Sequence, residues 1–152
     1  MLAGTVFNQL VRTLDGNSTL SDYVEQVYKG VRYNIEPDSM PCIMCEVRGN
    51  NELERDMGQI KHIYLDVDII AYVSSPSDPD YAIVGQKDMF YYGVLDIEND
   101  IRACLQSSYT LGNTVIDIKF LPTEFMDFEH KNTLMRGVRI PVRLLYRQTD
   151  GA

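Results

Sequence analysis

Two carboxylates stand two residues apart in the stretch IYLDVDIIAYV, which covers residues 63–73. Every odd position of this stretch is apolar, so it is predicted to form a strand with Asp66 and Asp68 on one face. Their Cα atoms would lie about 6.5–7 Å apart, and a metal ion could bridge them. A hard cation usually recruits further carboxylates, but Glu98 and Asp100 are predicted on the polar side of a helix. We therefore favour a solvated or interface role, with arginines as partners, over metal-dependent catalysis.

Four arginines crowd the last strand-like segment, at positions 136, 139, 143 and 147. On a strand, Arg139, Arg143 and Arg147 share one face at intervals of about 13 Å. They can form ion pairs with the two aspartates, either across strands or between subunits. A contact with the nucleic-acid backbone is the competing interpretation, but the net charge of −8 argues against it. A basic segment in an otherwise acidic chain instead favours self-association between oppositely charged surfaces.

Other residue types with catalytic potential do not form a recognisable motif. His62 and His130 lie at the borders of predicted elements, without a Ser or Cys in a nucleophile motif nearby. The sequence has no glycine-rich phosphate-binding loop. Cys42 and Cys45 form a C-x-x-C, but a strand points residues three apart to opposite faces, so they and Cys104 are predicted to be structural. We therefore expect neither an enzyme nor a bound cofactor.

The composition is typical of a single globular domain over residues 1–152. The chain is 45% hydrophobic and 24% charged. No apolar run approaches the roughly 20 residues of a membrane span. The N-terminus also lacks the layout of a secretory signal, so a cytosolic product without membrane contact is expected.

Three helices are predicted from apolar residues at helical spacing. The first contains Val6, Leu10 and Leu14 and ends at the DGN triplet. The second follows Ser18 or Ser21 as the cap and ends at Gly30, with an apolar side formed by Leu20, Val24, Val27 and Tyr28. The third runs from about Asp88 to Gln106 and includes Gly93, which we attribute to close packing of helix on sheet.

Four strands are predicted, around residues 42–47, 63–73, 114–121 and 137–147. Polar connections at 48–59 and 121–133 separate them, and the first of these would be a projecting two-stranded arm or a loop. Pro141 cannot donate a ladder hydrogen bond, which indicates an edge strand or a bulge. The predicted fold is therefore α+β, with a mainly antiparallel four-stranded sheet, helices packed on one face, and an exposed face rich in Asp, Arg and Tyr.

The order of these elements resembles a known family. The segment GVRYNIEPDSMPCIMCEV leads through Pro41 into a strand, and KHIYLDVDIIAYV places His62 before a long alternating strand. A covering helix, VLDIENDIRACL, and a final strand, RGVRIPVRLLYR, follow. From about Val6 to Arg147 this layout is similar to the tail terminator (tail completion) proteins of tailed bacteriophages.

The resemblance implies a small subunit that closes into a six-membered ring. Such a ring caps the tail tube, ends its polymerisation and presents its other face to the head-side connector or stopper protein, while DNA passes through the lumen without being read. It implies no enzymatic activity and no cofactor, and a place in the tail or neck of a virion assembled in the host cytoplasm.

Two sets of contact residues are predicted on this basis. The subunit interface would use Asp66, Asp68, Arg139, Arg143 and Arg147. The long connections, which depart from the shortest family members, would contact the tube or connector through Glu52, Glu54, Arg55, Phe125 and Phe128. The alternatives are another neck component, such as a head-tail stopper or a sheath-associated protein, or a small metal-dependent hydrolase using Asp66 and Asp68.

Overall fold

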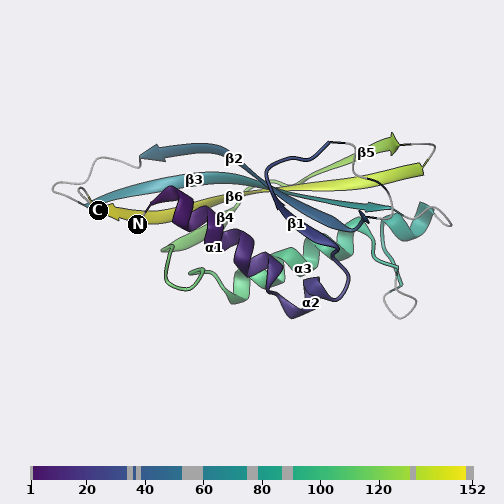
Figure 1. Cartoon of the computed structure of the whole chain (residues 1–152), viewed down its shortest axis with the longest axis horizontal. Helices are drawn as coiled ribbons and strands as arrows, with labels where there is room; N and C mark the ends of the chain where they lie inside the picture. Colours follow the sequence, from purple (N-terminus) through teal and green to yellow (C-terminus); the bar gives the residue numbers. More distant parts are fainter. Residues whose placement is uncertain are drawn as a thin grey trace.

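The computed structural model describes residues 2–33, 36, 39–52, 60–74, 79–86, 91–130 and 133–149. Within these ranges the chain forms an α+β fold in which one face of a six-stranded sheet is covered by helices (Figure 1). In chain order the elements are α1 (Ala3–Asp15), α2 (Ser18–Ser21), β1 (Gln26–Lys29), β2 (Cys42–Glu52), β3 (Ile60–Ser74), the 3-10 helix η2 (Pro79–Ala82), α3 (Val94–Ser107), β4 (Asp117–Phe120), β5 (Glu124–His130) and β6 (Thr133–Thr149).

The sheet has the order β1-β2-β3-β6-β4, with β5 also paired to β6. All pairs are antiparallel except β1 with β2, so the mainly antiparallel prediction is confirmed. The predicted number of four strands is wrong, because β1 and β5 are additional. The connection expected at 121–133 contains β5, which forms a hairpin with β6. β4 and β5 follow one another along the same side of β6, at residues 142–145 and 133–139 of that strand.

The main core lies between the sheet and helices α1 and α3. β3 and β6 supply alternate residues to it, as the period of two predicted, because successive side chains of a strand point to opposite faces. The residues of these two strands that are buried in the main core are Ile63, Leu65, Val67, Ile69, Ala71, Val73, Val138, Ile140, Val142, Leu144 and Tyr146. α1 adds Val6, Leu10, Val11 and Leu14, and thereby confirms the first predicted helix.

Pro141 lies in a strand with neighbours on both sides, so the predicted edge position is wrong. β3 pairs with one side of β6 along its length. On the other side Pro141 falls between β4 and β5, and its carbonyl accepts a hydrogen bond from the Leu121 N–H at 2.9 Å. Because the N–H and C=O of a strand residue point to the same side, the missing N–H of Pro141 faces this break in the ladder.

Residues 22–30 do not form the second predicted helix. α2 ends at Ser21, with Asn17 rather than a serine as its cap, and Val27 and Tyr28 belong to β1. Val27 packs into the main core while Tyr28 packs on the opposite face of the sheet. Val27 and Tyr28, which are adjacent in sequence, therefore point to opposite faces of the sheet. The apolar stripe of a helix would place both on one side. Gly30, at φ +87°, ends the strand instead of a helix.

The third helix begins later than predicted. α3 starts at Val94, and Gly93 is its N-cap rather than an interior residue; residues 87–90 lie outside the described ranges. A Cβ on Gly93 would lie 2.3 Å from the Ile83 carbonyl oxygen. The glycine is thus required by the approach of the Ile83 backbone, and the predicted packing against the sheet is wrong.

Asp100 was expected on the polar side of this helix but is only 7% exposed. It follows Ile97 by three residues, so it lies beside the apolar stripe. The Tyr23 hydroxyl donates a hydrogen bond to Asp100 Oδ2 at 2.7 Å. The pKa of Tyr23 is raised, mainly by burial and in second place by this hydrogen bond with Asp100.

The second face of the sheet carries a small apolar cluster of its own. Met40, Cys42, Met44 and Met135 are buried there, with partly buried Tyr28, Val31, Ile70 and Tyr72 packed against them. Cys42 belongs to this cluster and Cys45 to the main core, which confirms that the two thiols point to opposite faces. All three cysteines are free and buried. No helix among the described residues has the length and hydropathy to span a membrane.

Alkaline pH is expected to destabilise the fold through these thiols. Burial raises the pKa of Cys42 from 9.0 to about 11 and that of Cys45 to about 12. The folded state therefore holds the neutral thiols, and the resulting stability is complete below pH 9.0 and is lost as the pH rises toward these values. Urea unfolding from pH 8 to 11 should show a steeper decline for the native chain than for a Cys42→Ala, Cys45→Ala variant. Identical slopes would contradict the burial of the thiols.

Candidate interaction surface

A row of ion pairs occupies the face of the sheet that α1 and α3 do not cover. Asp66 and Arg143 are directly opposite one another in the β3–β6 ladder. Arg143 Nε donates to Asp66 Oδ1 at 2.8 Å, and its guanidinium lies 5.2 Å from the centre of the Tyr64 ring. The hydrogen bond with Asp66 raises the pKa of Arg143. Both side chains remain partly exposed, so the pair is accessible from outside the chain.

Asp68 is more deeply placed than Asp66 and has two arginine neighbours. It is 5% exposed, and its Oδ2 lies 3.1 Å from Arg48 Nη1 and 3.6 Å from Arg139 Nη1. The register of β2 against β3 shifts between Val47 and Gly49, and this irregularity brings Arg48 to Asp68. Arg139 also forms an ion pair with Glu124 of β5. The network thus joins four strands, β2, β3, β6 and β5, across the face.

This row, which we call the charged face, surrounds a hollow of about 230 Å³. The residues that line it are Arg48, Asp66, Val67, Asp68, Leu121, Arg139, Pro141 and Val142. The charges are balanced, because three arginines face Asp66, Asp68 and Glu124. Among the described residues, no group of three or more His, Cys, Asp or Glu side chains could hold a metal ion. The geometry therefore pairs Asp66 with Arg143, and Asp68 with Arg48 and Arg139.

The remaining predicted contact residues lie away from the charged face or outside the described ranges. Arg147 is exposed near the end of β6, opposite His62. Glu52 closes β2 and lies 3.6 Å from Lys61 Nζ. Glu54 and Arg55 fall within 53–59, outside the described residues. Phe125 is 52% exposed on β5, and Phe128 pairs with Met135 in the β5–β6 ladder.

Two members of the network were missed by sequence reasoning. Arg48 was assigned to a polar connection, although the adjacent Gly49 is a signal for a bulge within a strand. Glu124 was assigned to the connection before the last strand. Its position opposite Arg139 follows from the β5–β6 hairpin, which the sequence did not reveal.

Comparison with known proteins supports the fold over the whole chain. No protein-family model matches the sequence, and no curated protein matches it significantly. Among solved structures, the chain is similar to one from the virion of a native gene transfer agent particle, with a TM-score of 0.53 and 13% identity. The similarity covers 97% of this chain and 100% of that one. The two proteins therefore share a fold over nearly the whole of this chain.

Removal of the Asp68 carboxylate charge should destabilise the chain more than removal of an exposed acid. Asp68→Asn would leave Arg48 and Arg139 without their common counter-charge at a nearly buried position, with an expected cost of about 1–3 kcal/mol. Asp127→Asn is the control, because Asp127 is 54% exposed and pairs with Arg136 at 3.0 Å; its expected cost is about 0–1 kcal/mol. Urea unfolding measures both, and equal effects would contradict the role assigned to Asp68.

Proposed function

We propose that this chain is a structural virion protein that assembles into a ring of its own copies, as a tail terminator does. In this role the ring would end polymerisation of the tail tube and join the tail to the head-side connector. The single observation that carries the proposal is the fold shared, over nearly the whole chain, with a component of a gene transfer agent virion. The resemblance of its element order to tail terminators gives the finer assignment.

The charged face supports assembly rather than catalysis. Its arginines, and Tyr64 beside Arg143, are residue types enriched at protein interfaces. Its ion pairs are balanced within the chain but stay partly exposed, and such pairs fix the register of a contact more than they add affinity. We propose Asp66, Asp68, Arg139 and Arg143 as one contact surface between subunits, and no enzymatic function for the Asp66–Asp68 pair. Arg147, which was predicted in the same surface, lies further along β6.

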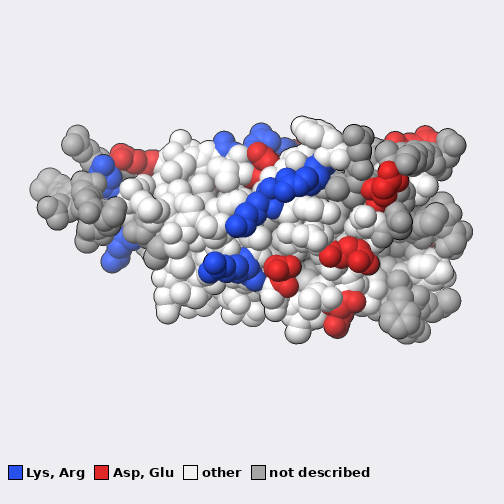
Figure 2. All heavy atoms as spheres, in the orientation of Figure 1, with Lys and Arg blue, Asp and Glu red and all other residues white. Residues whose placement is uncertain are grey.

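The distribution of charge along the molecule also supports contacts between unlike surfaces. In Figure 2 the lysine and arginine side chains lie over the centre and left of the molecule, and most aspartate and glutamate side chains lie toward the right. When two different surfaces of one chain meet head-to-tail, the assembly closes into a ring or continues as a filament. The net charge of −8 would give such a ring little attraction for DNA passing through it.

Negative-stain imaging of the purified protein tests ring formation. We expect annular particles of uniform size at micromolar concentration, alone or after addition of tail tube subunits. The tube assay then tests the finer assignment: a terminator should stop elongation of polymerising tubes and appear at one end of each tube. A protein that forms rings but never binds tube ends would fit a stopper or a sheath-associated component instead. Particles without rings in either condition would contradict the proposal.

A further inference from the structure

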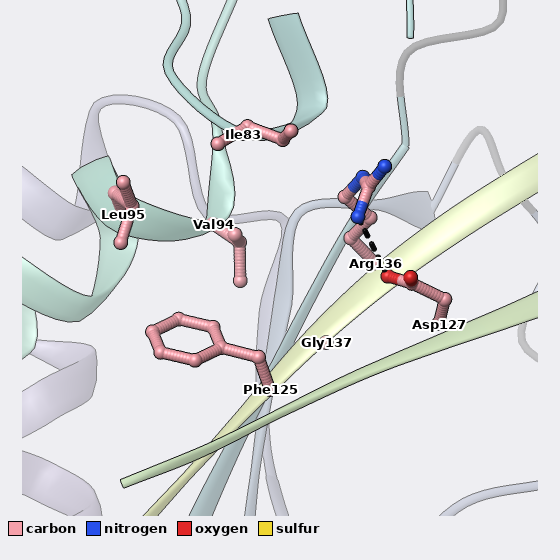
Figure 3. A pocket seen from close by; sticks show the side chains of 7 residues that line it. All are labelled: Ile83, Val94, Leu95, Phe125, Asp127, Arg136 and Gly137. Carbon is pink, nitrogen blue, oxygen red and sulfur yellow. Dashed lines mark hydrogen bonds and ion pairs between the residues drawn. The ribbon is translucent and has the colours of Figure 1, made fainter. Parts of the chain in front are cut away.

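An apolar hollow lies where the helical layer ends and the β5–β6 hairpin continues beyond it (Figures 1 and 3). Its volume is about 230 Å³, and Phe125 of β5 points toward Val94 of α3 across it. The residues that line it are Ile83, Val94, Leu95, Phe125, Asp127, Arg136 and Gly137. On one side the Asp127–Arg136 ion pair, at 3.0 Å, supplies a polar rim. We call this site the end hollow.

The apolar side chains around the end hollow are unusually accessible. Ile83 is 39% exposed, Leu95 43% and Phe125 52%, and the neighbouring Val84 is 55% exposed. Single exposed apolar residues are common, but here they come from three separate segments and meet at one concave site. A contiguous apolar patch with a polar rim is typical of an interaction surface.

The end hollow is held in shape by hydrogen bonds at the start of α3. The Asp96 carboxylate accepts from the Gly93 N–H at 2.8 Å and from the Gly85 N–H at 2.7 Å. The Leu95 N–H donates to the Ile83 carbonyl at 3.1 Å. These contacts fix the segment after η2 against the helix, so a partner would bind without first ordering the site.

The charges of the chain indicate which partner fits. β5, at the rim of the hollow, carries three acidic residues, two of which are already paired within the chain, Glu124 with Arg139 and Asp127 with Arg136. The third, Glu129, is exposed. The opposite end of the long axis holds the end of β2, the start of β3 and the end of β6 (Figure 1). Lys61 there is paired with Glu52, whereas Arg147 is exposed. The left–right separation in Figure 2 follows the same axis. Arg147 of a second copy therefore complements Glu129, beside the end hollow of the first copy, in charge.

We propose that the end hollow of one copy receives the arm end of a second copy, so that subunits join head-to-tail. The arm end consists of residues 50–52 of β2, 61–63 of β3 and 146–148 of β6. Leu2, just before α1, is exposed, and the N-terminus lies at the same end of the molecule as the C-terminal end of β6 (Figure 1), so Leu2 provides apolar surface for the contact. This inference rests on the proposed ring and names one of its contacts.

Substitution of the apolar rim tests the contact by sedimentation velocity of the full chain over a concentration series. Phe125→Ser and Leu95→Ser should each weaken self-association at least tenfold, because each removes apolar surface from the hollow. Tyr109→Ser is the matched control, since Tyr109 is 56% exposed but lies outside the hollow, and it should leave association within twofold. Circular dichroism and thermal unfolding verify that each variant is folded.

A charge exchange tests the identity of the partner surface. Glu129→Lys and Arg147→Glu should each weaken association, and a chain that carries both changes should recover most of it, because the two ends would again be opposite in charge. Rings that form equally well in the Phe125, Leu95 and charge variants would overturn the end hollow as the contact while leaving the ring itself intact. A native chain that stays monomeric at every concentration would overturn both.

Discussion

The pairing of β3 with β6 fixes both faces of this protein. The two strands are matched from Ile60 opposite Thr149 to Ser74 opposite Met135. Because the side chains of a strand alternate, a slip of one residue would move every core residue of a strand to the other face. The same register that buries Val67 and Val142 in the main core also sets Asp66 opposite Arg143 and Asp68 within reach of Arg139. Core packing and the charged face are therefore one constraint.

That constraint leaves two surfaces with different chemistry. The charged face is balanced and half-buried, whereas the end hollow is apolar and lies where the hairpin extends past the helices. A chain with two unlike surfaces is suited to head-to-tail assembly, in which one surface of each copy binds a different surface of the next. These two surfaces, together with the shared fold, are the physical reason to propose a ring-forming virion subunit rather than an enzyme.

Sequence patterns predicted the parts of the fold that depend on local periodicity. α1 and the long strands around 63–73 and 137–147 were predicted because their apolar residues recur at one clear period. The helix predicted to include residues 24–28 was wrong, because the apolar side chains of this segment fit a helix as well as a strand. Only the pairing of β1 with β2 decides between the two. Pro141 was misplaced because the break between β4 and β5 is a tertiary feature that no local pattern records.

The charged face was predictable in part, because it also depends on the period of two within single strands. Residue type and strand parity placed the two aspartates and the arginines on one face, but only the register shows which of them meet. The end hollow could not be predicted, because the segment after η2, the start of α3 and the β5–β6 hairpin bring its residues together from distant positions. Native mass spectrometry of the purified chain tests the central claim, that these surfaces bind copies of the same protein. The account predicts one closed species with a fixed number of chains that does not grow with concentration, and a spectrum of monomers alone would contradict it.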